Sequence, residues 1–309
     1  MIKMLLLAAA LTTAPCVPIA EAPAPVVTPA PAPAPAPVPV AAPVTPVAGA
    51  QAAIDGAKDG AVITLADGVD YGTLAITNRV HTAPVTINAG KALLKLQFKG
   101  SAGWIVNGGV YKGAMGTAAS GYGVYVLNSK RLTFNAPVLV DNLRGIVLSK
   151  SQDIAIDKAD ISGGRIDGIN IAASQRVTVT NSKCYAFITG DAHPDCIQLW
   201  SVAGSTPTAD VTLRGNSSIG DLQGFTGFNH VRNGVNDGGF DRIVIDGNAA
   251  AGPRPSGVVI SDCRDCTVTN NIARTPKGAR WMTQVRTTNC LRCTISGNVN
   301  GARPPLYDY

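Results

Sequence analysis

The feature that most constrains the fold is a repeat of short strands along the body of the chain. Five segments with apolar residues at alternate positions align with one another: 123–127, 145–149, 168–172, 196–200 and 257–261. A sixth segment, 282–286, fits more loosely. The first residues of the first four segments are 22, 23 and 28 residues apart in turn. Each segment is followed by a second short alternating strand. This recurrence predicts a solenoid of stacked strands.

The acidic residues argue against a helical fold. The chain has 20 acidic residues, and Glu21 is the only glutamate among them. Glutamate favours helix interiors whereas aspartate favours turns. A charged fraction of only 15% also excludes a coiled coil and a charge-rich disordered chain. Any carboxylate catalyst in the body must therefore be an aspartate.

The repeat also predicts which side chains point into the interior and which residues form one of the turns. Four of the second strands are followed three residues later by an asparagine: Asn216, Asn248, Asn271 and Asn298. Asparagine tolerates left-handed backbone angles and its amide can bond to the next rung, so these residues predict an asparagine ladder. The apolar positions predicted to point inward include Ile169, Ile171, Val177 and Val179. We predict an all-β fold, a single-stranded right-handed parallel β-helix of about nine or ten rungs, with residues 50–58 as a short N-terminal capping helix.

The N-terminal part has the composition of a leader and a tether. Residues 1–22 are predicted to be a signal peptide, because Lys3 precedes an apolar run that is too short to span a bilayer. Cys16 suggests a lipoprotein anchor, but Pro15 is the wrong residue before it. Residues 23–49 repeat Pro-Ala and Pro-Val and are predicted to form a semi-rigid linker, followed by the β-helix domain at 50–309. We expect export by a signal peptide, a secreted, periplasmic or cell-surface location, and no transmembrane segment.

Segment 51–71 resembles a known group. Its Gln51-Ala52-Ala53-Ile54 start, the run 60–68 and Tyr71 are similar to the cap and first strand of pectin-lyase-like right-handed β-helix proteins. That group contains secreted polysaccharide enzymes and phage tailspikes. The resemblance extends over about residues 50–303 and implies the fold rather than a particular reaction.

Aligning the rungs places polar residues in columns. Asp167 and Asp195 occupy the same position on successive rungs, so their Cα atoms should be about 5 Å apart. Arg165 and His193 form the equivalent pair two residues earlier, and Arg144 precedes Asp167 by one rung. Two like charges at this spacing should raise the pKa of one aspartate unless a cation compensates. An aspartate before a turn is also commonly structural.

Further columns point outward from the same strands. Asn170 and Gln198 share one column, and Trp200 lies in the next, where its indole is either a platform for a sugar or packed under loop 203–208. The pair Asp167 and Asp195 is also a weak candidate for holding calcium, a cation that takes oxygen ligands. No metal or other cofactor is predicted beyond this.

A second resemblance is to polygalacturonases. Asp167-Gly168-Ile169 and Asp195-Cys196-Ile197 are similar to the D-G-I and D-C-I ends of that family's motifs. The resemblance implies that the two aspartates help to activate the attacking water. However, Pro194 stands in the place of the family's general-acid aspartate, and the Gly-His-Gly and Arg-Ile-Lys motifs are missing. Inverting hydrolysis would lose one of its two carboxylates.

A polysaccharide lyase fits the residues better. β-Elimination on a uronic acid needs a neutralised carboxylate, a base for the C5 proton and a positive surface. The chain has a formal charge of +6, with Arg144, Arg165, Arg232 and Lys277 as candidate neutralisers. The base would be His193, His230 or an arginine. We predict an exported enzyme that cleaves an acidic polysaccharide by elimination. A polygalacturonase-like hydrolase, an epimerase and a non-catalytic glycan-binding adhesin remain alternatives, and basic patches interleaved with aromatic residues, as expected for nucleic-acid binding, are absent.

The cysteines have two interpretations. Cys263-x2-Cys266 and Cys290-x2-Cys293 have the spacing of a four-thiolate zinc site. The repeat instead stacks Cys263 on Cys290 and Cys266 on Cys293, within disulfide range. In an exported chain we favour disulfides or buried thiols over zinc. Cys184 and Cys196 could also pair.

Overall fold

The computed structural model describes residues 44–45, 47–113, 118–190 and 193–301, which belong to the compact unit Ala41–Tyr309. The predicted signal peptide, and the predicted linker up to residue 43, lie outside these residues. Within the described ranges, no helix is both long and apolar enough to cross a membrane.

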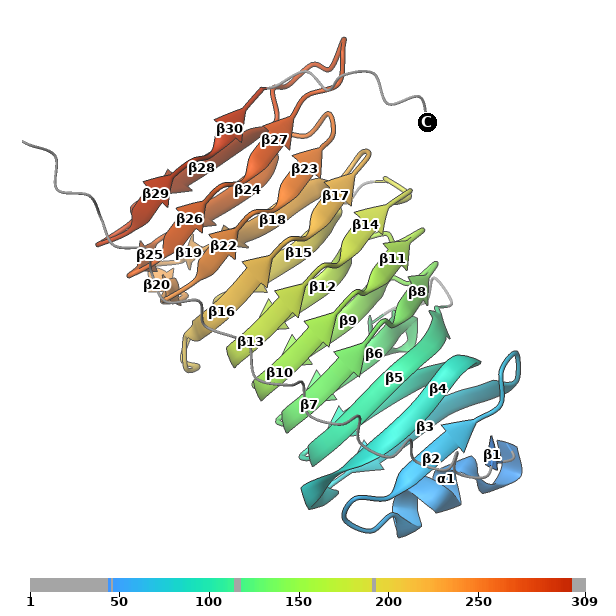
Figure 1. Cartoon of the computed structure of the whole chain (residues 1–309). Coiled ribbons are helices and arrows are strands. Elements are labelled where there is room, and N and C mark those ends of the chain that lie inside the picture. Colours follow the sequence, from blue (N-terminus) through green and yellow to red (C-terminus); the bar gives the residue numbers. More distant parts are fainter. Residues whose placement is uncertain (1–43, 46, 114–117, 191–192, 302–309) are drawn as a thin grey trace, which may run out of the picture. The chain divides into compact units, whose positions relative to one another are not determined.

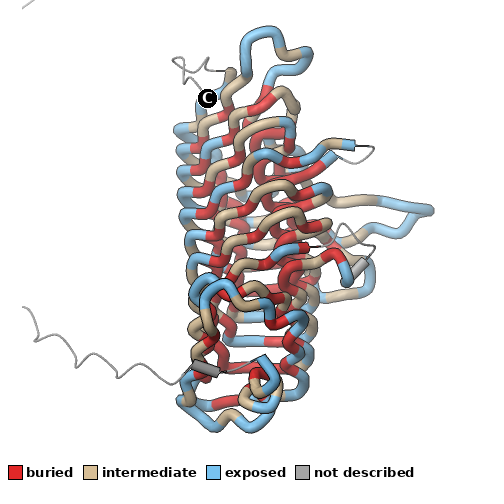
Figure 2. Tube along the Cα trace, turned by 90° about the vertical axis from the view of Figure 1, so that its right-hand side faces the viewer, coloured by how far each residue is buried: buried red, intermediate tan, exposed pale blue. Residues whose placement is uncertain are grey.

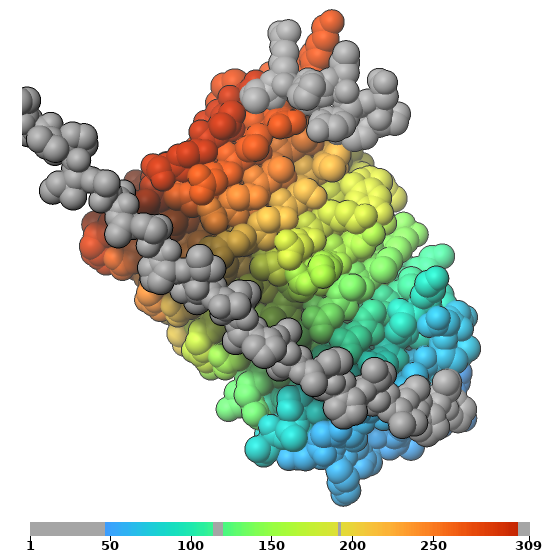
Figure 3. Space-filling model, viewed as in Figure 1, coloured from blue at the N-terminus to red at the C-terminus, as the bar shows by residue number. Residues whose placement is uncertain are grey.

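The described residues form a right-handed parallel β-helix, as predicted. Its strands belong to one continuous 28-stranded sheet in which every pairing is parallel, and a separate two-stranded antiparallel hairpin adds β19 (Val231–Arg232) and β20 (Val235–Asn236). The strands stack in sequence order from the N-terminal to the C-terminal end of the helix (Figure 1). Successive rungs are visible as parallel coloured bands in Figure 3. The fold class expected from the repeat and from the first resemblance is therefore confirmed.

Each rung contributes strands to three faces. The first face contains β3 (Asp70–Thr77), β4 (Val80–Lys99), β6 (Tyr122–Leu127), β9 (Arg144–Ser149), β12 (Asp167–Ala172), β15 (Asp195–Trp200), β18 (Gln223–Phe228), β24 (Ser256–Ser261) and β28 (Gln284–Thr288). These nine strands agree with the predicted nine or ten rungs.

The second and third faces complete each rung, and the long strands β4 and β5 run through more than one face. The second face contains β2 (Val62–Leu65), β5 (Ala102–Lys112), β7 (Lys130–Asn135), β10 (Gln152–Asp157), β13 (Gln175–Thr180), β16 (Thr208–Arg214), β21 (Phe240–Asp241), β22 (Val244–Asp246), β25 (Cys263–Arg264), β26 (Thr267–Thr269) and β29 (Thr294–Ser296). The third contains β8 (Val138–Val140), β11 (Asp160–Ser162), β14 (Lys183–Tyr185), β17 (Ser217–Ile219), β23 (Ala249–Ala251), β27 (Ile272–Arg274) and β30 (Val299–Asn300). β1 (Val44–Thr45) pairs with β2, and a 3-10 turn spans Ala118–Gly121.

The core is a stack of inward side chains from all three faces. Ile169, Ile171, Val177 and Val179 are fully buried, as predicted. Buried segments recur rung after rung in Figure 2. Each fully buried side chain of this size contributes roughly 1.5–3 kcal/mol relative to exposure, so the stack itself is a main source of stability.

The N-terminal end is covered by α1 (Val47–Gly56), which begins three residues before the predicted start at residue 50. Its buried residues are Ala50 and Ile54, which lie four positions apart and so share one face of the helix. The helix thus covers the first rung with a narrow apolar stripe, and the predicted cap is confirmed.

The asparagine ladder is present. The side-chain oxygens of Asn248 and Asn271 accept the backbone N–H of Asn216 (2.9 Å) and Asn248 (3.0 Å), and Asn298 accepts from Asn271 (2.9 Å). The expectation that these asparagines adopt left-handed backbone angles is wrong. The residue before each one does so instead: Gly215, Gly247, Asn270 and Gly297, with φ of 65°, 64°, 56° and 68°. The preceding residue makes the turn, which leaves each asparagine free to direct its amide along the stack.

Two parts of the repeat differ from the sequence alignment. Val285 pairs with Val258 rather than with Ile260, so segment 282–286 is shifted by two residues, with an irregularity after Ser256. The sequence alignment did not include β18, because Gly227 occupies an inward position where the other strands have an apolar side chain. A Cβ at Gly227 would lie 2.3 Å from the Cδ1 of Ile260, so neighbouring side chains fill its place and remove the apolar alternation.

A charged column runs along the turn that enters the second face. It alternates arginine and aspartate on successive rungs, all with φ between 51° and 58°: Arg131, Asp153, Arg176, Asp210, Arg242, Asp265 and Arg292. Three ion pairs of 2.6 Å join Arg176 to Asp153, Arg242 to Asp210, and Arg292 to Asp265. We call these seven residues the charged ladder.

Candidate functional site

The candidate site lies where the strands of the first face begin. Asp167 is the register partner of Asp195 on one side and of Arg144 on the other, as the alignment predicted. All three are the first residues of their strands, directly after the loops that lead from the third face to the first. Parallel pairing therefore brings together two aspartates that are 28 residues apart in the chain.

Both aspartates are buried, with exposed fractions of 1% for Asp167 and 0% for Asp195. Arg144 Nε lies 2.7 Å from Asp167 Oδ2, and Asn170 Nδ2 donates to the same oxygen at 3.1 Å. Thr226 Oγ1 donates to Asp195 Oδ1 at 2.6 Å. The two carboxyl groups are therefore enclosed by neighbouring donors and are not accessible from the surface.

Burial also controls the ionisation of the two aspartates. Desolvation is the main cause that raises the pKa of Asp167 to about 6, and the neighbouring charge of Asp195 adds to it, while Arg144 opposes it. Desolvation likewise raises the pKa of Asp195, against hydrogen bonds from His193 and Thr226. The like-charge effect expected from the sequence contributes, but desolvation is the larger cause.

The accessible titratable group is His193. Its side chain is 61% exposed, and its Nδ1 lies 3.5 Å from Asp195 Oδ2. The hydrogen bond to Asp195 raises the pKa of His193, although partial burial opposes the shift. Arg165 is also exposed, on the loop before β12. Its Nη2 would lie 3.3 Å from a Cβ at Gly190, so Arg165 lies beside the loop that leads to His193.

The side chains of the outward columns form hydrogen bonds mainly with one another. Asn170 and Gln198 are both 7% exposed, and Asn170 Nδ2 donates to Gln198 Oε1 at 3.3 Å. The indole N–H of Trp200 also donates to Gln198 Oε1. The Trp200 ring is stacked on His230, with centroids 5.6 Å apart and planes 27° apart. One indole face is thus covered by His230, and a sugar could reach only the other.

Two predicted cations lie apart from this cluster. Arg232 is exposed on the β19–β20 hairpin, and Lys277 is exposed on the loop after β27. Within the described part of the chain, neither side chain hydrogen-bonds to Asp167, Asp195 or His193. Of the predicted neutralisers, Arg144 is therefore committed to Asp167, and Arg165 is the cation that remains exposed beside the site.

Three residues at the site were not found from the sequence. Tyr122 accepts a hydrogen bond from Arg144 Nη1 at 3.3 Å, and Thr226 binds Asp195. Arg254 is paired with Asp221 at 2.6 Å, and its charge acts on both His193 and Asp195. Thr226 continues the column of Asn170 and Gln198, so extending the alignment by one rung would have located it.

A disulfide holds the loop that carries His193. Cys184 on β14 pairs with Cys196 on β15, one of the pairings that the sequence allowed, with their Cα atoms 5.5 Å apart. Both cysteines are fully buried, and the loop between them contains His193. The bond joins the third face to the first at the base of this loop, so it restrains both ends of the segment that supports the imidazole.

The site does not fit calcium. Calcium takes six to eight oxygen ligands, whereas the oxygens of Asp167 and Asp195 accept from Arg144, Asn170 and Thr226 in a sealed position. Among the described residues, no group of three or more His, Cys, Asp or Glu side chains is placed to hold a metal ion. The calcium alternative for this pair is therefore not supported by its surroundings.

No family model matches the sequence, and no curated protein matches it. The structure is similar to the Dettilon tailspike protein, at 12% identity and a TM-score of 0.48, covering 82% of this chain and 57% of the tailspike. It is similar to alginate lyase from Paenibacillus sp. str. FPU-7, at 16% identity and a TM-score of 0.45, covering 83% and 97%. It is also similar to PfbA, a surface adhesin of Streptococcus pneumoniae, at 11% identity and a TM-score of 0.38, covering 85% and 91%. All three TM-scores are below 0.5, so these similarities carry no functional argument.

Proposed function

We propose that this chain is a carbohydrate-active enzyme that cleaves a uronate-containing polysaccharide by β-elimination, with His193 as the base. The observation that carries the proposal is an exposed imidazole held on a buried aspartate, beside an exposed arginine. The accessible chemistry of the site therefore belongs to His193 and Arg165 rather than to the aspartate pair.

Elimination assigns a role to each of these groups. Neutral His193 takes the C5 proton of a uronate through the ring nitrogen that does not face Asp195. The electron pair of the C–H bond forms the C4–C5 double bond, and the bond from C4 to the glycosidic oxygen breaks. The electron pair of that bond stays on the oxygen, which takes up a proton from solvent and becomes the hydroxyl of the new reducing end. Asp195 orients the imidazole and stabilises the imidazolium that forms. Arg165 pairs with the uronate carboxylate and so favours loss of the neighbouring proton.

The burial of the aspartates supports elimination over hydrolysis. Glycoside hydrolysis uses two carboxyl groups that both reach the scissile bond or its water, about 5–10 Å apart. Here both carboxyl groups are sealed, and Pro194 occupies the position of the missing general acid. The net charge of +6 supports an acidic glycan as the partner. A secreted or cell-surface location is part of this proposal.

The test is a panel of uronate polysaccharides assayed for the ultraviolet absorbance of unsaturated uronate and for new reducing ends. The proposal expects both signals to grow together. Reducing ends without absorbance would show hydrolysis, and binding without either signal would show a glycan-binding protein. In both cases elimination would be wrong.

Variants then assign the base. His193→Gln should abolish the absorbance signal, because glutamine cannot accept the proton. His230→Gln, which changes the half-buried histidine that is stacked on Trp200, should retain it. If His193→Gln retained full activity, His193 would not be the base.

A further inference from the structure

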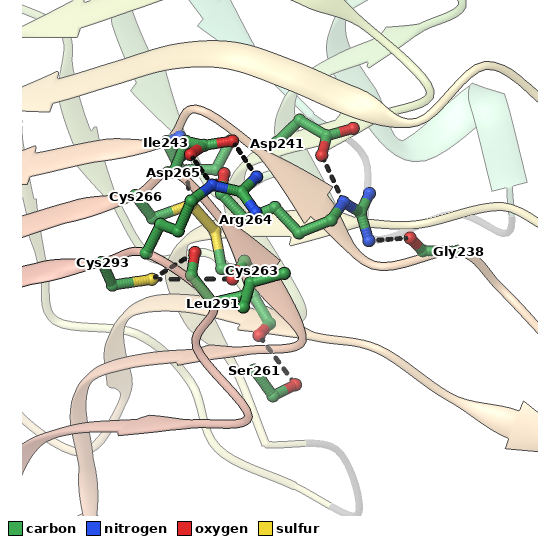
Figure 4. The surroundings of a disulfide bond; sticks show 12 residues. Gly238, Asp241, Ile243, Ser261, Cys263, Arg264, Asp265, Cys266, Leu291 and Cys293 are labelled. Atoms are coloured by element: carbon green, nitrogen blue, oxygen red, sulfur yellow. Dashed lines mark hydrogen bonds and ion pairs between the residues drawn. A yellow bond between two sulfur atoms is a disulfide. The ribbon is translucent and has the colours of Figure 1, made fainter.

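The last two described rungs carry four cysteines in one cluster. Cys263 and Cys266 form a disulfide, whereas Cys290 and Cys293 are free and half-buried. The bond thus lies within one rung, with Cα atoms 6.0 Å apart, rather than between rungs as the sequence suggested. Figure 4 shows this disulfide with Cys293 beside it. A four-thiolate zinc site is not formed, because two of its thiols are bonded to each other.

The register stacks the free cysteines on the bonded ones. Arg264 bridges to Leu291, and Val268 pairs with Ile295, both in parallel. This places Cys263 beside Cys290 and Cys266 beside Cys293, one strand spacing apart. A spacing of about 4.8 Å between neighbouring strands is within the Cα range of disulfides, about 4.4–6.8 Å. Both cross-rung pairs therefore have backbone positions that a disulfide can join.

The Cys293 thiol lies beside the bonded pair and donates to two backbone carbonyl oxygens. Its Sγ lies 3.5 Å from the carbonyl oxygen of Cys263 and 3.7 Å from that of Leu291 (Figure 4). Burial, together with a hydrogen bond to Cys293, raises the pKa of Cys290 to about 12 and keeps that thiol protonated. The register stacks Cys293 on Cys266, so Cys293 is the free thiol that lies beside that sulfur.

We propose that these cysteines form a thiol–disulfide exchange site, in which Cys293 converts the Cys263–Cys266 disulfide into a Cys266–Cys293 disulfide that fastens the last rung to the one before it. The thiolate of Cys293 attacks Sγ of Cys266, and a new sulfur–sulfur bond forms there. The bond from Cys266 to Cys263 breaks, and Cys263 leaves as a thiolate that takes up a proton from solvent. One disulfide exists before and after the step, so no oxidant is required.

The location gives the exchange a consequence. In the part of the chain that the structure describes, the last rung is covered on one side only, and Leu291, Ile295 and Val299 are 53%, 49% and 45% exposed. A disulfide within the preceding rung does not hold this rung. A cross-rung disulfide would hold it covalently, and because it closes a longer loop it restricts the unfolded chain more. The exchange thus switches the end of the β-helix between an unfastened and a fastened form.

The experiment follows the free thiols in the full chain, purified without reductant. Samples are incubated at mildly acidic or mildly alkaline pH, and the free thiols are then alkylated at acidic pH with a maleimide. Arg264, Arg274, Arg286 and Arg292 separate the cysteines, so trypsin places each of the four on its own peptide. Mass spectrometry then reads which thiols were free and which peptides remain linked.

The expected result is a change of partners without a change in thiol count. At acidic pH the label should be on Cys290 and Cys293. After alkaline incubation it should appear on Cys263 and Cys290, with the peptides of Cys266 and Cys293 linked, because the thiolate is the nucleophile. A label that stays on Cys290 and Cys293 throughout would overturn the proposal, and this wild-type time course depends on no variant.

Two matched variants identify the attacking thiol. Cys293→Ser should stop the exchange, whereas Cys290→Ser, which changes the neighbouring free cysteine, should leave its rate within about twofold. Exchange that persists in Cys293→Ser, or that is lost equally in both variants, would show that Cys293 is not the nucleophile.

Discussion

Two edges of the β-helix are built in opposite ways. The asparagine corner, between the second and third faces, repeats one short turn with Asn216, Asn248, Asn271 and Asn298 at equivalent positions. The loop edge, between the third and first faces, has connections of different lengths and carries Asp167, His193 and Asp195. The repeating edge supports the stack, and the irregular edge carries groups that are not needed on every rung. Stability and function should therefore respond to different substitutions.

The largest expected effect separates function from fold at the loop edge. His193→Ala should lower kcat for a uronate polysaccharide by about 10²–10⁴-fold, the range for loss of a general base. Because the side chain is 61% exposed, the thermal midpoint should remain nearly unchanged. Kinetics and calorimetry on the same sample check this. A large loss of stability with unchanged kcat would show that His193 supports the fold rather than the reaction.

The converse effect is expected at the asparagine corner. Asn248→Ala removes the acceptor for the backbone N–H and side-chain amide of Asn216, both of which are buried, and the donor to Leu213. Leaving such groups unsatisfied should cost about 3 kcal/mol in the free energy of unfolding. Denaturant titration measures the loss, and Lys91→Ala at an exposed site is the control. Activity per folded molecule should not change, and a selective loss of activity would contradict the separation of the two edges.

A pH profile sharpens the assignment at the loop edge. Asp195 raises the pKa of His193, so Asp195→Asn should lower that pKa towards its usual value. The base would then stay neutral to lower pH, and the acidic limb of the kcat/KM profile should move to lower pH while its plateau falls. Asp167→Asn should move this limb less, because the charge of Asp167 is a smaller cause of the shift. An unmoved limb in Asp195→Asn would mean that His193 does not control the rate.

The smallest effect is expected at the charged ladder. Arg176 and Asp153 are joined at 2.6 Å, but the two side chains are 52% and 38% exposed. Exposed pairs of this kind contribute about 0–1 kcal/mol and are screened by salt. Arg176→Ala should therefore lower the free energy of unfolding only slightly at low salt, and less still at high salt. A cost equal to that of Asn248→Ala would mean that the charged ladder supports the stack as strongly as the asparagine corner.

The repeat explains what the sequence could predict. Asp167 and Asp195 both precede an aligned strand, so their adjacency followed from the register alone. The inward positions and the asparagine ladder followed in the same way. Thr226 was missed because Gly227 interrupts the apolar alternation of its strand. Wherever one rung repeats the previous one, a column can be inferred from the sequence.

Burial at the site could not be predicted in this way. Whether an aspartate at the start of a strand faces solvent depends on Arg144, Thr226 and the loop that ends at His193. These residues come from different rungs, and the loop has no equivalent on the neighbouring rungs. The two-residue shift of Val285 has a similar origin, because the irregularity after Ser256 is local to one rung. Sequence periodicity carries no information about such single features.

The most direct test of the account is the titration of His193 by nuclear magnetic resonance. The chain has three histidines, so the imidazole signals can be assigned with one variant for each. If His193 is held by Asp195, its pKa should lie above the usual value of about 6.5 and should fall in Asp195→Asn. An ordinary pKa that does not respond to Asp195→Asn would show that the two groups are not coupled, and the proposed base would lose its support.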